Sequence, residues 1–515
     1  MNSFILILDA GTHTIRARLY DQNGIRSFSV KEPILCMSPK PQWIEQNPMQ
    51  VWAIQISLAR QVMEQNDVRI EQISAIGVTN QRESIVLWEK ATGRPVYNIV
   101  IWYDRRTIGV CEEMLNEKVE KQVQKISGLK IDPFFSASKI QWVLDNVPGL
   151  RLRADKGEIL FGTVDSWIVW HLTKGKLHIT DYTNASRTLL FNIQTLDWDE
   201  SLLKLFRIPS SILPLVRPSA EIHGMTDVSI FGKEIPIACI IADQQASLFG
   251  NNCLKKGDIK NSYGVGNFIL MNTGNERFAT KNGTLRTIAW AIKDKVEYAQ
   301  EGSIFVGGLA IQWIKDQLRL IHTADDSAYY ASRIKDSGGV YLVPSFFGLG
   351  APYWNMRSKG IFLGMTFDSN IYHLVRATLD AICYQSRDVI EAIEKDTEMV
   401  VKTLHVDGGA AENDFLLQLQ SDIAKVPIIR PQNLDTTSQG VAWLVGIIIG
   451  MWDKEAIDHM YTIQHTFHPN GEKEYYTEKE YAGWKEAVSL ARCWGMQCEM
   501  RNKEFMKKNP GISEQ

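Results

Sequence analysis

The chain lacks a disulfide framework. Its seven cysteines are scattered along 515 residues, no Cys-x-x-Cys pair occurs, and an odd number cannot pair completely. The sequence therefore predicts free thiols, several of them buried in apolar segments, as is usual in a reducing compartment. The N-terminus, MNSFILILD, has no basic stretch and reaches an aspartate early, which disfavours a secretory signal. We expect a cytoplasmic protein.

Long apolar runs and a strong excess of one charge are also missing. The longest apolar run, VAWLVGIIIGMW from Val441, is about twelve residues long, whereas a membrane-spanning helix needs about 20. The formal net charge of −3 gives no basic field that would attract nucleic acid or an anionic membrane. We therefore expect no nucleic-acid partner and no membrane span.

What the sequence does contain is a pattern of strands, turns and helices that starts again near the middle. Residues 5–20 form an apolar run, a glycine turn and an alternating run, and DIKNSYGVGNFILMNTG repeats that layout from Asp258. A length of 515 residues suits two large domains. We expect an α/β protein of two related halves, residues 1–252 and 253–515, that pack directly together.

Two features near the C-terminal end have simple structural interpretations. LDTTSQGVAWLVGIIIG predicts a buried helix whose N-cap is Thr436, Thr437 or Ser438. The charged segment after Cys498, which ends in Pro-Gly and a few polar residues, is expected to fray.

The first glycine turn, Asp9 to Thr14, contains the groups that a phosphate site needs. Gly11 lets backbone N–H groups point inward, threonine hydroxyls add donors, and Arg16 adds charge if it points back. Asp9 ends a buried strand, where a carboxylate is costly unless it is paired or holds a cation through water. A plain Gly-Thr hairpin whose aspartate accepts turn hydrogen bonds explains the residues equally well, so the turn alone leaves both interpretations open.

Two further glycine turns lie at strand ends in the second half. One runs from Tyr263 to Gly266, and the other from Asp407 to Ala410, where a helix begins. The amides and dipole of a helix start attract anions, and glycine admits a close approach. Sharp chain reversals would explain the same glycines. No clustered His or Cys spacing supports a transition-metal site, and His13 alone is more typical of a turn.

Other polar residues that follow strands are candidates for binding a hydroxyl compound. Asp243 could accept a proton from a hydroxyl, although an isolated aspartate in that place is more often a helix cap. Arg82 and Glu83, in NQRES, could bind one small polyol or form a surface ion pair worth about 0–1 kcal/mol. Three aromatic residues could line an apolar wall or simply belong to the core: Trp102, Phe134 and Phe268.

Several longer segments carry a resemblance to a known family. They are VTNQRES, FGTVDSWIVWHLT, DYTNASRTLLFNIQTLDWD, ADQQASLFG, VPSFFGLGAPYW and VDGGAAEN. Together they resemble the FGGY carbohydrate kinases, most closely the glycerol kinase branch, nearly end to end from Asp9 to about Trp484. NQRE distinguishes the chain from xylulose kinase-like members, which usually carry Gln-Met-His-Gly there.

The resemblance implies two actin-like (ribonuclease H-like) domains with a cleft between them, the first binding the polyol and the second ATP. It implies that Asp243 is the general base and that Asp9 and Asp243 hold Mg²⁺, Asp9 through water. The implied polyol-binding residues are Arg82, Glu83, Trp102, Phe134, Asp243, Gln244 and Phe268. The implied nucleotide-binding residues are Thr12, His13, Thr14, Arg16, Val265, Gly308, Gln312, Gly409 and Asn413.

The chain departs from the family pattern at four positions in these turns and in the apolar wall. Ala10 and His13 replace the usual Gln and Thr of the first turn, Val265 replaces a threonine, and Phe134 replaces a polyol-binding tyrosine. Loss of one hydrogen bond to a buried hydroxyl costs roughly 1–3 kcal/mol, which water can partly restore. IFGKEIP also lacks the glycine-rich loop with arginine that binds a sugar bisphosphate in some members.

The resemblance implies ATP- and Mg²⁺-dependent phosphorylation of glycerol to sn-glycerol 3-phosphate. Phe134 leaves open a kinase for another polyol or triose, such as erythritol or dihydroxyacetone. His13 and Val265 leave open a non-catalytic regulatory protein of the same fold, although Asp9, Asp243, Arg82 and Glu83 are all present. Family members are often dimers or tetramers, so a homodimer or homotetramer is expected.

Overall fold

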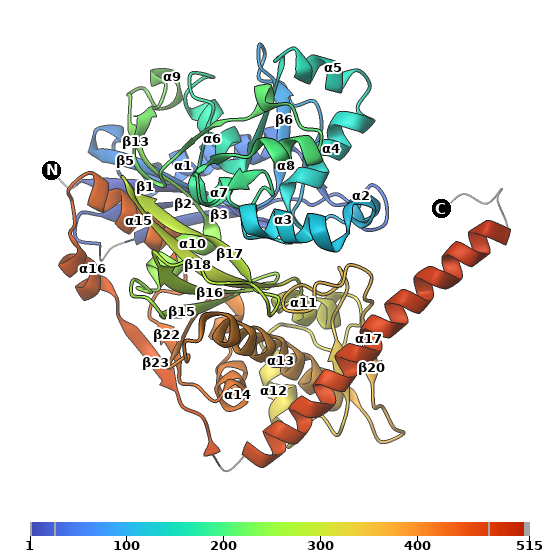
Figure 1. Cartoon of the computed structure of the whole chain (residues 1–515). Helices are drawn as coiled ribbons and strands as arrows, with labels where there is room; N and C mark the ends of the chain where they lie inside the picture. Colours follow the sequence, from blue (N-terminus) through green and yellow to red (C-terminus); the bar gives the residue numbers. More distant parts are fainter. Residues whose placement is uncertain (1–2, 25–26, 472–473, 509–515) are drawn as a thin grey trace.

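The computed structural model describes residues 3–24, 27–471 and 474–508. In Figure 1 the two halves of the chain lie one above the other, and the last helix projects beyond the body. The seven cysteines are all free, and four of them are buried. Within the described residues no helix is long and apolar enough to cross a membrane. The cytoplasmic location stays a prediction.

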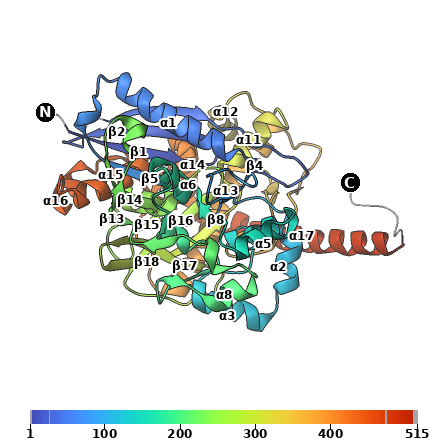
Figure 2. The same cartoon turned by 90° about the horizontal axis from the view of Figure 1, so that it is seen from above.

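The first half is built on a five-stranded arrangement around one central strand. β1 (Phe4–Ala10) lies between β2 (Thr14–Asp21) and β5 (Ile73–Asn80), antiparallel to the first and parallel to the second. β3 (Ser27–Pro33) extends the antiparallel side, and β14 (Pro236–Ala242) extends the parallel side. All seven residues of β1 are buried, which explains its unbroken apolar sequence. Figure 2 shows α1 (Pro48–Glu64) running along β1 and β2.

The second half repeats this arrangement strand for strand. β15 (Ile259–Tyr263) is central, antiparallel to β16 (Asn267–Gly274) and parallel to β21 (Leu404–Asp407). β18 (Lys295–Ile304) continues on one side and β22 (Ile428–Pro431) on the other. The identical order and directions confirm the predicted α/β fold with two related units.

The two units join in one sheet and through one pair of helices. A single bridge from Ala220 in β13 (Ala220–Met225) to Ile292 in β17 (Leu285–Ile292) makes the sheet continuous. α10 (Asp243–Gly250) and α15 (Thr436–Ile448) each follow the last strand of a unit and cross closely.

Two glycines permit that helix crossing. A Cβ on Gly250 would overlap the carbonyl oxygen of Thr436, and a Cβ on Gly440 would overlap that of Ala246. The backbones therefore touch where the halves meet, so the halves pack directly, without a linker between them.

Two local predictions were wrong. The N-cap of α15 is Asp435, whose carboxylate accepts a hydrogen bond from the N–H of Ser438 at 3.2 Å, because a charged oxygen is a stronger acceptor than a hydroxyl. The tail does not fray at Cys498, since α17 (Glu474–Lys508), a helix of 35 residues, continues past this cysteine to Lys508. Glu, Lys, Arg and Met are good helix formers, so charge alone does not indicate a helix end. Residues 509–515, the rest of that tail, lie outside the described residues.

Candidate active site between the two halves

A cavity of about 300 Å³ lies where the strand ends of the two units face each other. β1, β5 and β14 bring Asp9, Arg82 and Asp243 to it from the first unit. The turns after β15 and β21 close it from the second unit. Carboxyl ends of parallel strands are the usual place for ligands in α/β sheets, which explains why the three glycine turns meet here.

Most of the predicted site residues line this cavity. From the first half they are Asp9, Thr12, His13, Thr14, Arg16, Arg82, Glu83, Trp102, Asp243 and Gln244. From the second half they are Val265, Phe268 and Gly409, with Asp407 and Gly408 beside them.

Arg82 and Glu83 are buried and held in a network of ion pairs. Arg82 donates to both carboxylate oxygens of Glu301, at 2.8 and 2.9 Å. Arg187 donates to Glu83 at 2.7 Å and to Glu301 at 3.0 Å. The alternative of a surface ion pair is therefore wrong for Arg82 and Glu83, since both side chains are almost fully buried.

Asp243 begins α10 and presents its carboxylate to the cavity. Its side chain is 25% exposed, and its Oδ1 lies 3.5 Å from Nε of Arg82. Oδ1 also accepts from the N–H of Gln244 at 2.7 Å. Burial raises the pKa of Asp243 above its ordinary value of 3.8, while Arg82 and Lys260 act in the opposite direction. A carboxylate of raised basicity that faces a cavity can accept a hydroxyl proton.

Asp9 is a buried carboxylate with one cationic neighbour. Nη1 of Arg16 lies 3.2 Å from its Oδ2. Burial raises the pKa of Asp9 to about 7, and the charges of Asp435 and Asp243 add to the rise. A cation would relieve this crowding of acidic groups.

The donor set at Asp9 fits Mg²⁺ held mainly by water and phosphate. In the described part of the chain no three His, Cys, Asp or Glu side chains are grouped closely enough to hold one ion. Mg²⁺ keeps several waters and commonly uses one or two carboxylates together with substrate phosphates, so a complete protein cage is not required.

The turns of the second unit need their glycines for two different reasons. Gly408 has a φ of +87°, and a Cβ there would overlap the carbonyl oxygen of Tyr263. Gly409 has no heavy atom within 4 Å of the place a Cβ would take, so its backbone faces open space. Gly408 therefore shapes the turn, and Gly409 leaves room for a ligand.

Comparison with known proteins identifies the family to which the chain belongs. A model of the FGGY family of carbohydrate kinases matches residues 4–250 as its N-terminal domain and residues 259–448 as its C-terminal domain. The chain belongs to the FGGY carbohydrate kinases. As a member of this family it is a phosphotransferase with an alcohol group as acceptor.

Its relatives include named glycerol kinases over almost their full length. That of Caldanaerobacter subterraneus subsp. tengcongensis is 48% identical and covers 96% of this chain and 99% of its own. Glycerol kinase 2 of Thermotoga maritima is 47% identical, with 95% and 99% covered. The structure of Plasmodium falciparum glycerol kinase with ADP has a TM-score of 0.84, 30% identity, and 95% and 98% covered.

Three predicted nucleotide-binding residues of this FGGY kinase lie outside the cavity. Gly308 starts α11 (Gly308–Asp316), and its N–H donates to the carbonyl of Gly264 at 2.9 Å, so it borders the second turn. Asn413 caps α14 (Asp414–Ala424) and donates to Ser327 at 3.2 Å. Gly308 is thus adjacent to the cavity, whereas Gln312 and Asn413 are not among the residues that line it.

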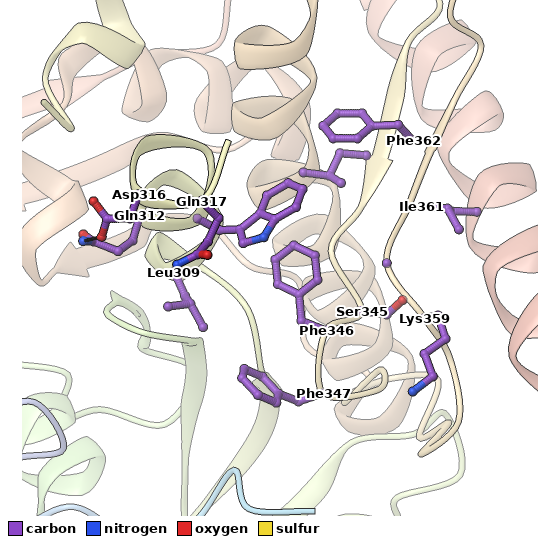
Figure 3. Close-up of a pocket in the computed structure, with 13 residues that line it drawn as sticks. Leu309, Gln312, Asp316, Gln317, Ser345, Phe346, Phe347, Lys359, Ile361 and Phe362 are labelled. Atoms are coloured by element: carbon purple, nitrogen blue, oxygen red, sulfur yellow. Dashed lines mark hydrogen bonds between the residues drawn. The ribbon is translucent and has the colours of Figure 1, made fainter. Parts of the chain in front are cut away.

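Gln312 lines a separate and larger pocket of about 600 Å³. Figure 3 shows Gln312 beside Asp316, to which its amide donates, on one side of a group of aromatic rings. The rings belong to Trp313, Phe346, Phe347 and Phe362. The lining of this pocket is mostly apolar, and its carboxylate, Asp316, accepts from Gln312. Arg82, Glu83 and Asp243 line the smaller cavity instead, so that cavity is the candidate active site.

Phe134 also lies outside the cavity lining, one layer behind it. It is buried, with its ring centroid 5.7 Å from that of Trp102 and 5.2 Å from that of Phe305. Trp102 in turn lines the cavity and donates from its indole nitrogen to the hydroxyl of Thr12 at 3.0 Å. Phe134 therefore supports the apolar wall that Trp102 and Phe268 form.

Sequence reasoning missed three buried charges that contact the site residues: Arg187, Glu301 and Lys260. Lys260 donates to the side-chain oxygen of Gln244 at 2.6 Å. Burial lowers the pKa of Lys260 to about 8. Burial would raise the pKa of Glu301, but Arg187 and Arg82 together lower it to about 2. A single charged residue inside a short uncharged stretch, as in YAQEGSIF and IKNSY, was the available signal.

Proposed function

We propose that this chain is a glycerol kinase, which transfers the terminal phosphoryl group of ATP to glycerol and forms sn-glycerol 3-phosphate. The observation that carries the proposal is the partly exposed carboxylate of Asp243, which faces the cavity beside Arg82 and opposite the glycine turns. The glycerol kinase names of relatives at 47–48% identity support the acceptor.

The acceptor binds to the first half in this proposal. Arg82 donates to one hydroxyl of glycerol and Glu83 accepts from another, while Gln244 adds an amide. Trp102 and Phe268 contact the carbon chain, with Phe134 behind them. The split into an acceptor-binding half, residues 1–252, and a nucleotide-binding half, residues 253–515, is part of the proposal.

The phosphates of ATP lie against the glycine turns. Thr12, His13, Thr14 and Arg16 provide donors from the first half, and the amides beside Val265 and Gly409 provide them from the second. The nucleoside extends past Gly308 toward Gln312 and Asn413. When bound, Mg²⁺ neutralises charge on the phosphates, and Asp9 and Asp243 are the residues that would hold it, Asp9 through water.

The chemistry needs one proton acceptor and an aligned pair of oxygens. Asp243 accepts the proton of the terminal hydroxyl of glycerol while the oxygen of that hydroxyl bonds to the terminal phosphorus of ATP. ADP leaves with the oxygen that had joined it to that phosphorus. Closure of the two halves would exclude water, which otherwise competes as the acceptor.

An ADP-release assay with ATP, Mg²⁺ and glycerol tests this function. We expect ADP formation to depend on glycerol, with the product identified as sn-glycerol 3-phosphate by an enzyme specific for it. ATP and Mg²⁺ without glycerol form the control. Binding of ATP without any glycerol-dependent ADP release would instead support the non-catalytic regulatory protein.

Phe134 favours one alternative acceptor class. Because a phenyl ring cannot bond a hydroxyl, a kinase for another polyol or triose is the second candidate. A comparison of kcat/KM for glycerol, erythritol and dihydroxyacetone decides between them. We expect glycerol to exceed the others by about tenfold or more, as one hydrogen bond to a buried hydroxyl is worth that much.

Self-association into a homodimer or homotetramer is a further part of the proposal. Large apolar side chains are exposed along α17, and they support a contact between copies: Leu490, Trp494, Met496, Met500 and Phe505. Sedimentation velocity at several protein concentrations tests this expectation, and a monomer throughout would contradict it.

A further inference from the structure

We propose that Glu301 and Lys260, two buried charges of the second half, are positioning residues that orient the acceptor-binding side chains of the first half. The inference rests on the proposed acceptor site. Neither residue lines the cavity, so each would act through the side chain that it touches.

Glu301 fixes the plane of the Arg82 guanidinium. It lies on β18 and is fully buried. Each of its oxygens accepts from one terminal nitrogen of Arg82, at 2.8 and 2.9 Å, and a bidentate pair of this kind allows a single orientation. That arrangement leaves Nε of Arg82 pointing toward Asp243, 3.5 Å from its Oδ1.

Two other groups hold Glu301 itself. Its Oε1 accepts from Ser303 at 2.7 Å and from Nη2 of Arg187 at 3.0 Å. Arg187 also donates to Glu83 at 2.7 Å, so one carboxylate connects both acceptor-binding residues. If Glu301 lost its charge, Glu83 would be the carboxylate left to both arginines, with Asp243 beside Arg82 alone. Arg82 would then be free to turn toward Glu83 and Asp243.

Lys260 determines which end of the Gln244 amide faces the cavity. It lies on β15 and is fully buried. Its ammonium donates to Oε1 of Gln244 at 2.6 Å and to the hydroxyl of Ser262 at 2.7 Å. An ammonium can only donate, so it binds the amide oxygen and leaves the amide NH₂ for other partners. Gln244 can then donate to an acceptor hydroxyl.

The consequence is that acceptor binding depends on the contact between the halves. Arg82 and Gln244 belong to the first half, whereas the charges that orient them belong to β18 and β15 of the second. A substitution at Glu301 or Lys260 should therefore change the KM for glycerol much more than the KM for ATP.

The first test replaces Glu301 without changing its shape. In E301Q we expect the KM for glycerol to rise about tenfold or more, because Arg82 loses its charged partner, while the KM for ATP changes less than about twofold. In an Arg82→Lys background the same substitution should have an effect below about twofold, since the bidentate pair is already absent.

The second test replaces Lys260. Lys260→Met removes the donor at similar length, and Lys260→Gln restores a neutral donor. We expect the KM for glycerol to rise about tenfold in the first variant and less in the second. The matched control is Asp388→Asn. Asp388 is a buried carboxylate of the second half that does not line the cavity and accepts from Tyr353, Tyr481 and Trp484. Its loss should lower the thermal midpoint without changing the KM for glycerol.

The outcomes separate this inference from the function on which it rests. Normal wild-type turnover with an unchanged glycerol KM in E301Q and Lys260→Met would overturn the positioning roles alone. Equal rises in both KM values would also overturn them, because they would indicate general damage. A wild-type protein that turns over no polyol would overturn the proposed function as well.

Discussion

Phe134 stands where the family pattern usually has a polyol-binding tyrosine, and it lies directly behind the cavity wall. The Phe134 ring lies behind Trp102 and beside Phe305, and the Arg187 guanidinium carbon is 5.9 Å from the ring centroid. Because position 134 is buried, a polar group added there would change the affinity for the acceptor strongly. The affinity would rise if the group bonds the acceptor and fall if it is left without a partner.

We expect Phe134→Tyr to lower the KM for glycerol. A hydroxyl that bonds the acceptor adds roughly 1–3 kcal/mol of binding, or about 5- to 150-fold. The measurement is KM for glycerol at saturating ATP, with KM for ATP as the control. A glycerol KM that stays the same or rises would show that position 134 does not reach the acceptor.

The environment of Asp243 gives a pH dependence. Burial raises its pKa above the ordinary 3.8, so the carboxylate becomes protonated at a higher pH than a surface aspartate does. A general base must be ionised, so kcat should be full on the alkaline side and fall as the pH decreases through this raised value. A kcat profile between pH 4 and 8 measures it. A rate that persists down to the pH range of an ordinary aspartate would contradict the assignment.

At the scale of elements, the strands and turns were predictable and their partners were not. The apolar runs and glycine turns predicted β1, β15 and β21 and the turns after them, because strand period and turn chemistry are local properties. The pairing of Arg82 with Glu301 joins residues 219 positions apart, which no local pattern encodes. For the same reason the sequence did not indicate that Gly250 and Gly440 lie at a helix crossing.

That crossing gives a prediction about stability. We expect Gly440→Ala to lower the free energy of unfolding by about 1–3 kcal/mol or more, because its Cβ would overlap the carbonyl oxygen of Ala246. The matched control is Gly109→Ala in α2 (Ile108–Met114), where nothing lies within 4 Å. There alanine should stabilise by about 0.5–1 kcal/mol through its helix propensity. Denaturant unfolding measures both, and equal midpoints would contradict a tight crossing.

At the scale of the whole molecule, two copies of one strand arrangement place the glycine turns of the second half opposite Arg82 and Asp243 of the first. The family resemblance in the sequence predicted this plan and most of the residues that line the cavity. Gln312 and Asn413 were named through the resemblance alone, and they lie outside the cavity where the chemistry would occur.

The most direct test of Asp243 as the general base compares Asp243→Asn with the wild type in glycerol-dependent ADP release. Asparagine keeps the shape of the side chain but cannot accept the hydroxyl proton. We predict a fall in kcat of about 10²- to 10⁴-fold, with ATP binding measured by calorimetry unchanged within about twofold. A variant that keeps near-normal kcat would contradict this role of Asp243, because the hydroxyl proton would then have another acceptor.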